Sequence, residues 1–146
     1  MSLKFSQGTY KIKNPEKYIG VGAPRYRSSW EFSVMKMCDE NEAIRQWASE
    51  SIKIPYRDPL TGKATVYVPD FLVVFEDKNH NKKAEVWEIK PANQAFKENV
   101  GKNKYNQAQF IRNQVKWAAA KNYCAQHHLQ FRILTEHDLF GKTLKG

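Results

Sequence analysis

The sequence has few cysteines and no long apolar run. Its two cysteines, Cys38 and Cys124, lie beside apolar residues in segments with helical patterning, which favours buried thiols over a disulfide framework. No stretch approaches the roughly 18 apolar residues that a membrane-spanning helix needs. Residues 1–6 lack the apolar core of a secretory signal. We therefore expect a protein that is neither membrane-embedded nor secreted.

Acidic residues are scarce relative to basic ones. The chain has 15 Asp and Glu against 24 Lys and Arg, a formal charge of +9. This excess favours a polyanionic partner such as nucleic acid, because phosphate contacts release condensed counterions, although it could also serve solubility alone. The 146 residues are 41% hydrophobic and 13% aromatic, enough for one domain with one core. The mean hydropathy of −0.72 indicates a strongly hydrophilic surface.

The chain divides at residue 27 by its patterning. Residues 1–27 are basic and weakly periodic, and we expect an irregular arm packed on the domain that residues 28–146 form. Tyr10, Tyr18 and Tyr26 alternate with basic side chains there. This mixture could contact a nucleic-acid backbone, or it could place tyrosines on the core with lysines outward.

Residues 28–146 predict an α/β fold, an α+β sandwich rather than a barrel. Ser28 and Glu31 have the spacing of a capping box for a helix that ends near residues 39–41. Alternating patterns over 44–75 and 84–90 predict a series of antiparallel hairpins, and 92–105 predict an exposed loop. A long helix, a strand at 130–134 and a short helix capped by Thr135 follow. The expected apolar stripe of the long helix comprises Ala108, Ile111, Val115, Ala118 or Ala119, and Tyr123.

An aspartate in the apolar run at 68–71 is the first candidate for chemistry. Burying the Asp70 carboxylate is costly unless it is paired or bound to metal. Glu88 and Lys90, two apart in a strand, share one face, while Trp87 and Ile89 take the other. If the two strands are neighbours, Asp70 and Glu88 converge. The alternative is a solvated strand face and an aspartate that ends a strand.

Two carboxylates and a carbonyl suit a hard cation such as Mg²⁺. Such an ion polarises a phosphate and lowers the pKa of bound water, and Lys90 could orient or activate the nucleophile. The set therefore predicts phosphodiester hydrolysis.

Short motifs in this order resemble a known group of enzymes. Residues 69–70 followed by 88–90 resemble the PD-(D/E)xK nuclease superfamily, and residues 27–31 resemble its TnsA N-terminal-like members. Matches at 14–18, 26–31, 54–56, 69–71, 88–91, 114–117 and 133–136 resemble the head-completion nucleases of T4-like phages over nearly the whole chain. The resemblance implies a restriction-endonuclease-like fold, with a mixed central β-sheet flanked by helices.

The resemblance also implies roles for individual residues. Asp70 and Glu88 would bind the metal with the backbone carbonyl of Ile89, and Lys90 would be the catalytic lysine. Glu31 would bind a second metal or hold a metal-bound water, although its capping-box position offers a purely structural alternative. The metal would be Mg²⁺, with Mn²⁺ as a substitute, and no nucleotide cofactor is implied.

Basic residues near this set are candidates for DNA contact. Lys97, Lys102 and Lys104 follow the catalytic strand, and Arg27 precedes the first helix. Arg112 and Lys116 recur at helical spacing and could bind phosphate or merely solvate the helix. His127, His128, His137 and Cys124 match no zinc spacing.

The sequence thus predicts a metal-dependent endonuclease for double-stranded DNA. The resemblance implies action on packaged phage DNA ends, portal or neck proteins as partners, and a location in the virion or the host cytoplasm. The alternatives are a non-catalytic neck or portal assembly protein that retains the fold, and a junction or repair nuclease.

Overall fold

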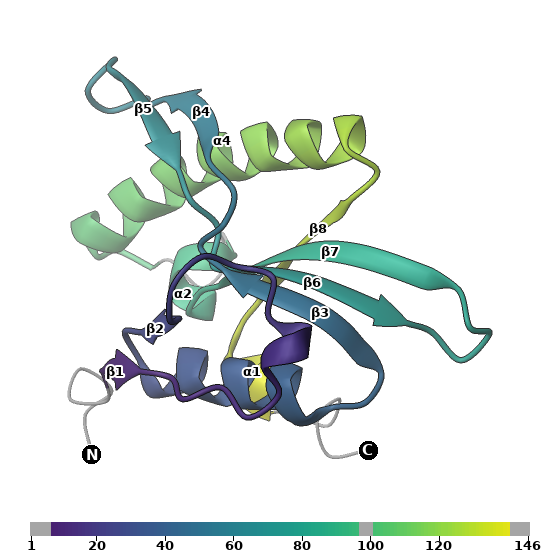
Figure 1. Cartoon of the computed structure of the whole chain (residues 1–146). Coiled ribbons are helices and arrows are strands. Elements are labelled where there is room, and N and C mark those ends of the chain that lie inside the picture. The colour runs from purple at the N-terminus through teal and green to yellow at the C-terminus, as the bar shows by residue number, and fades with distance from the viewer. Residues whose placement is uncertain (1–6, 97–100, 141–146) are drawn as a thin grey trace.

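The computed structural model describes residues 7–96 and 101–140, and a four-stranded mixed sheet lies at its centre (Figure 1). The strand order is β3 (Ile44–Ser49), β6 (Phe71–Glu76), β7 (Lys82–Ile89) and β8 (Gln130–Leu134). The β3–β6 and β6–β7 pairs are antiparallel, and β7–β8 is parallel. Helix α4 (Lys104–Gln126) covers one face, and α1 (Ser29–Glu40) and α5 (Glu136–Phe140) lie on the other. The predicted restriction-endonuclease-like α/β fold is confirmed.

Each face of the sheet carries its own apolar cluster. The cluster towards α1 includes Met35, Trp47 and Phe71, each at most 2% exposed. The cluster towards α4 includes Trp117 and Ala120 from that helix. Burying both sheet faces removes apolar surface from water, which is the main favourable term in folding. The sheet is therefore fixed from both sides, and its strand ends provide a rigid base for side chains.

The predicted hairpin series over residues 44–75 is wrong in its pairing. Strand β3 pairs with β6, while β4 (Ile54–Arg57) and β5 (Ala64–Tyr67) form a separate hairpin beside α4 (Figure 1). The extended run also breaks at residues 68–70, so Asp70 precedes β6 instead of lying inside a strand. Pro69 explains the break, because proline has no N–H to donate to a ladder.

The predicted loop at 92–105 and the predicted face of the long helix also need correction. A short helix, α2 (Ala92–Ala95), packs against α4 through buried alanines, and α4 begins at Lys104. On α4, Ile111 is 48% exposed, whereas Asn113, Trp117, Ala120 and Cys124 are buried. The predicted face was wrong because it was chosen from aliphatic residues and tyrosine, whereas the buried face also contains the polar Asn113 and the large Trp117.

The first α-helix and the last two elements within the described residues follow the sequence prediction. Helix α1 begins after its N-cap Ser28, whose Oγ accepts the Glu31 N–H at 3.2 Å, and it ends at Glu40. Strand β8 spans Gln130–Leu134. Thr135 precedes α5, and its Oγ1 accepts the His137 N–H at 3.2 Å. These boundaries were predictable because local capping chemistry sets them.

Residues 7–27 lie along α1 and β3. Strand β1 (Gly8–Thr9) pairs with β2 (Arg25–Tyr26), and a 3₁₀ helix, η2 (Pro15–Lys17), contacts β3. Tyr10 is 5% exposed, and Tyr18 and Tyr26 pack against the cluster towards α1. The tyrosines of this segment therefore lie on the core, which favours the second of the two interpretations above.

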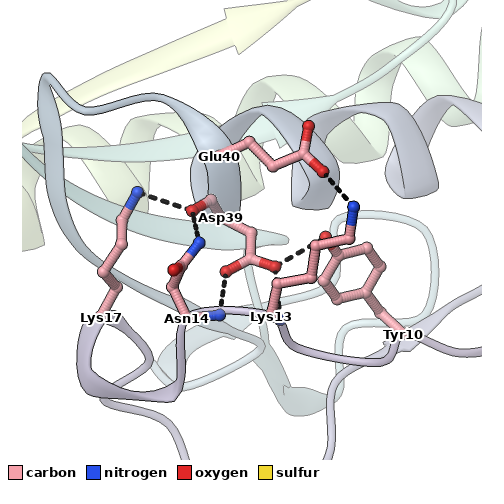
Figure 2. A network of polar contacts seen from close by, with 6 residues as sticks. All are labelled: Tyr10, Lys13, Asn14, Lys17, Asp39 and Glu40. Atoms are coloured by element: carbon pink, nitrogen blue, oxygen red, sulfur yellow. Dashed lines mark hydrogen bonds and ion pairs between the residues drawn. The ribbon is translucent and has the colours of Figure 1, made fainter.

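Asp39, at the end of α1, holds this segment in place (Figure 2). Its fully buried carboxylate accepts hydrogen bonds from the Tyr10 hydroxyl at 2.8 Å and from the backbone N–H groups of Lys13 and Asn14 at 2.8 and 3.0 Å. Its carbonyl accepts from Asn14 Nδ2 and Lys17 Nζ, both at 2.8 Å. One residue thus anchors several points of the N-terminal segment.

Both cysteines are buried free thiols, as predicted. Burial raises the pKa of the Cys38 thiol to about 12, which keeps it protonated. In residues 7–96 and 101–140, none of the helices has the length and apolar character required to cross a membrane.

Candidate active site

Asp70 and Glu88 meet where β6 begins and β7 ends. The antiparallel register pairs Phe71 with Trp87. Asp70, which precedes Phe71, therefore lies opposite Glu88, which follows Trp87. Asp70 Oδ2 accepts the Ile89 N–H at 2.7 Å, and the Asp70 carbonyl accepts the Glu50 N–H at 2.9 Å. Asp70 is therefore held between the ends of β3 and β7. The predicted convergence of the two carboxylates is present, although Asp70 reaches it from a break between strands.

The carboxylates of half-buried Asp70 and buried Glu88 repel one another. Burial raises the pKa of Asp70 well above its ordinary value, and the charge of Glu88 raises it further. Glu88 is 5% exposed, and burial raises its pKa too, against the opposing effects of Lys90 and a hydrogen bond from Tyr67. Paired buried carboxylates are costly unless a cation compensates them. This site therefore favours a positively charged ligand.

Lys90 lies directly after β7, on the same side as Glu88. Its Nζ is 3.6 Å from Glu88 Oε2, and its side chain is 26% exposed. Its backbone N–H donates to the Leu134 carbonyl at 2.9 Å, which ties the chain to β8. Trp87 and Ile89 point into the cluster on the opposite face. Strand alternation thus places the lysine as the sequence predicted, with its ammonium group partly open to solvent.

Glu31 approaches the same place from the first turn of α1. Its Oε1 accepts the Arg27 N–H at 2.9 Å, one residue earlier than a capping box requires. Burial raises the pKa of Glu31, while the Arg27 hydrogen bond and the charges of Arg27 and Lys90 oppose that rise. Its charge also raises the pKa of Asp70. Glu31 therefore supports the helix start and lies within electrostatic reach of the site.

The donors at this place fit a hard divalent cation. The oxygen atoms of Asp70 and Glu88 are the ligand type that Mg²⁺ prefers, usually with water completing the shell. Among the described residues, no group of three acidic, histidine or cysteine side chains is close enough to hold one ion. Any ion would accordingly rest on the two carboxylates, backbone oxygen and water, with Glu31 acting from farther away.

The predicted DNA-contact residues have unequal surroundings. Lys102 and Lys104 are exposed at the start of α4, whereas Lys97 lies outside the described residues. Arg27 forms an ion pair with Glu50, and Arg112 Nε is 3.0 Å from Asp58 Oδ2. These two arginines are therefore engaged within the protein.

Lys116 does not lie on a solvated helix face. It is partly buried, with its Nζ 5.9 and 5.5 Å from the ring centroids of Tyr56 and Tyr67. Burial and the nearby charge of Lys90 lower the pKa of Lys116, and Glu88 opposes this. The structure therefore places Lys116 against the tyrosines of the β4–β5 hairpin and within electrostatic reach of Glu88.

Two further residues, Tyr67 and Glu50, lie at the site and were not predicted from the sequence. Tyr67, at the end of β5, is 4% exposed and donates to Glu88 Oε1 at 2.6 Å. Glu50 follows β3 with a positive φ of 50°, which is uncommon for a non-glycine residue. Nothing in the local sequence of β5 identifies Tyr67 or its partner, because the other three residues of this strand are exposed. Glu50 carried no signal in the sequence.

Comparison with known proteins defines the class of this fold and site. Residues 41–136 match the family model described as TnsA-like endonuclease N terminal. This match includes Asp70, Glu88 and Lys90 and covers well over half of the chain, so the chain belongs to this nuclease family. Over 149 aligned residues it is also 30% identical to a particular protein, the head completion nuclease of Enterobacteria phage T4, covering 95% of this chain and 97% of that relative. The family resemblance stated from the sequence is confirmed.

Proposed function

We propose that this chain is an Mg²⁺-dependent DNA endonuclease that acts on packaged phage DNA ends as a head-completion nuclease. The observation that carries the chemistry is the convergence of Asp70, Glu88 and Lys90 at the ends of β6 and β7. The support for the setting is the similarity to the T4 head completion nuclease along almost the full length of both chains. We further propose a location in the virion or the host cytoplasm, with portal or neck proteins as partners.

The proposed metal would be held by the carboxylates of Asp70 and Glu88 and by the Ile89 carbonyl. When bound, Mg²⁺ or Mn²⁺ would polarise the phosphate and supply an acidified water. The Ile89 N–H fixes the Asp70 carboxylate at 2.7 Å. Lys90, whose ammonium group is 3.6 Å from Glu88 Oε2, would orient the nucleophile and stabilise charge that develops on the phosphate.

The proposed DNA partner fits the charge of the protein. The chain carries a formal charge of +9, and Lys102 and Lys104 are exposed where α4 begins, the helix that also carries Lys116. Such lysines would contact backbone phosphates without reading sequence. Arg27 and Arg112 would contribute after exchanging their carboxylate partners for phosphate.

Plasmid cleavage tests this proposal. Supercoiled plasmid is incubated with the parent protein in Mg²⁺, in Mn²⁺ and in a chelator, and Asp70→Asn is compared with Glu42→Gln. Glu42 is an exposed carboxylate outside the proposed site, so its variant controls for loss of an acidic charge. We expect nicked and linear products only with metal, and only from the parent and Glu42→Gln. Intact plasmid with the parent in both metals would instead support a non-catalytic assembly protein.

The substrate class within this proposal can be separated by a second assay. Linear duplexes with blunt or overhanging ends are compared with a four-way junction of the same strands. A head-completion role predicts cutting of the linear ends. Preference for the junction would favour the repair or junction nuclease alternative, which shares the fold.

A further inference from the structure

A buried tyrosine connects the β4–β5 hairpin to the carboxylate set. Tyr67 is 4% exposed, and its hydroxyl donates to Glu88 Oε1 at 2.6 Å. The other carboxylate oxygen, Oε2, lies 3.6 Å from Lys90 Nζ. The two oxygen atoms of Glu88 therefore have different neighbours, and the rotation of this carboxylate is fixed.

The ring of the same tyrosine also supports a lysine. Lys116 Nζ lies 5.5 Å from the Tyr67 ring centroid, within the range of a cation–π contact, and 5.9 Å from that of Tyr56. Glu88 attracts this ammonium group, whereas Lys90 repels it. Tyr67 thus contacts a carboxylate through its hydroxyl and an ammonium group through its ring.

We propose that Tyr67 is a positioning residue that fixes the Glu88 carboxylate for the metal and holds Lys116 as a second ammonium group for the DNA phosphate. This inference rests on the proposed function. A hydroxyl that donates to a carboxylate makes a short, strong hydrogen bond. Such bonds to metal ligands orient them, and removing one typically weakens metal affinity by about 10-fold to 100-fold.

Contacts with α4 hold the β4–β5 hairpin, and with it Tyr67, in position. Asp58, in the hairpin turn, pairs with Arg112 of α4 at 3.0 Å, and the Ile54 and Tyr67 side chains lie in the same cluster as Trp117. The ends of β4 and β5 are thereby fixed to the helix that carries Lys116. The β4–β5 hairpin thus has a role at the site, because it carries Tyr67 and holds it against Glu88 and Lys116.

The test uses single-atom and charge variants of the full chain. Tyr67→Phe removes the hydroxyl and keeps the ring. Tyr56→Phe makes the same change in the neighbouring tyrosine of the hairpin. Lys116→Met removes the ammonium group and keeps most of the side-chain length. Mn²⁺ affinity is measured by calorimetry, duplex binding is measured by fluorescence anisotropy in Ca²⁺, and thermal unfolding of each variant is recorded.

Two separate losses are expected. Tyr67→Phe lowers Mn²⁺ affinity by about 10-fold and leaves duplex binding close to that of the parent, whereas Lys116→Met weakens duplex binding and leaves Mn²⁺ affinity close to that of the parent. Tyr56→Phe behaves as the parent in both assays. A crystal structure of metal-free Tyr67→Phe should show the Glu88 carboxylate rotated.

The outcomes separate this inference from the proposed function. If Tyr67→Phe binds Mn²⁺ as tightly as Tyr56→Phe, the positioning role is overturned. If Lys116→Met binds duplex as the parent does, the role of the second ammonium group is overturned. If the parent itself binds neither Mn²⁺ nor duplex, the proposed function fails, and this inference fails with it.

Discussion

The backbone N–H of Ile89 donates a 2.7 Å hydrogen bond to Oδ2 of Asp70. This bond joins a residue that precedes β6 to the last residue of β7, and so it locks the two carboxylate-bearing segments in register. It also favours the charged form of Asp70 against burial and the repulsion of Glu88. This bond only partly offsets burial and repulsion, so the charged form of both carboxylates together still requires a compensating cation.

Asp70→Asn should make the metal-free protein more stable at neutral pH. Because the folded-state pKa of Asp70 is raised, its ionisation opposes folding above its ordinary pKa, and the neutral amide removes the repulsion by Glu88. We expect the free energy of unfolding to rise by roughly 1 kcal/mol. Urea unfolding in a chelator measures it. A variant that is less stable than the parent would show that Asp70 is a structural residue.

Lys90→Met should separate chemistry from metal binding. The side chain is partly exposed and its ammonium group is 3.6 Å from Glu88, so its removal leaves both carboxylates in place. We expect plasmid cleavage to slow by about 100-fold or more, with Mn²⁺ affinity unchanged or slightly increased. Lys36→Met, an exposed lysine on α1, provides the control. Equal rates for the two variants would remove Lys90 from the mechanism.

Glu31→Gln distinguishes the two roles of Glu31. A glutamine can still accept the Arg27 N–H that the carboxylate accepts at 2.9 Å, so the start of α1 should survive. The charge that acts on Asp70 is lost. We expect thermal unfolding within a few degrees of the parent and cleavage reduced by about 10-fold or more. Parental cleavage combined with loss of stability would leave Glu31 as a helix residue alone.

The sequence predicts those features of the structure that residues close together in the chain determine, and it does not predict the pairing of distant segments. Ser28 and Thr135 cap the starts of α1 and α5 through their own side chains, so the start of α1 and the β8–α5 junction were predictable. The alternation of Glu88 and Lys90 with Ile89 is equally local. In contrast, β3 and β6 are separated in the sequence by the β4–β5 hairpin, and the residues of neither strand indicate that the two strands pair.

The site was predictable in its acidic and basic members but not in its supports. Asp70, Glu88 and Lys90 are residue types that apolar segments rarely contain without a reason. Tyr67 resembles any buried strand tyrosine until its partner, 21 residues later, is known. The inner face of α4 was predicted incorrectly because Asn113 and Trp117 are buried on it, and Lys116 is partly buried beside the rings of two tyrosines.

Asp39→Ala should detach the N-terminal segment from α1. The buried carboxylate accepts from Tyr10, Lys13 and Asn14 (Figure 2), and truncation leaves buried donors without partners. We expect the free energy of unfolding to fall by about 3 kcal/mol, as measured in urea. Glu42→Gln, a nearby exposed carboxylate, should change it by less than about 0.5 kcal/mol. Similar values for both variants would contradict the anchoring role.

The same carboxylate makes a pH-dependent contribution of known sign. Burial alone would raise the pKa of Asp39, but the hydrogen bonds from Lys13, Tyr10 and Asn14 outweigh burial and lower it below 3.8. A lowered pKa contributes stability that is present above about pH 4 and is lost as the pH falls through the folded-state pKa. The difference in unfolding free energy between parent and Asp39→Ala should therefore shrink below pH 4. A constant difference down to pH 2 would contradict this.

Replacing Lys102 and Lys104 with alanine should weaken duplex binding through salt-dependent contacts. Both are exposed at the start of α4. The slope of log affinity against log salt should fall by about 2, one for each lost phosphate contact. The double variant Lys82→Ala and Lys83→Ala, in the first two residues of β7 and at the opposite end of that strand from Glu88, removes equal charge away from the site. Equal slopes in the two variants would place the DNA elsewhere.

A crystal structure of the parent protein soaked in Mn²⁺, with anomalous data collected for that ion, tests whether Asp70 and Glu88 share a metal. We expect an anomalous peak between the two carboxylates, absent from crystals of Asp70→Asn. Fully occupied Mn²⁺ elsewhere on the protein, with these two carboxylates uncoordinated, would contradict it.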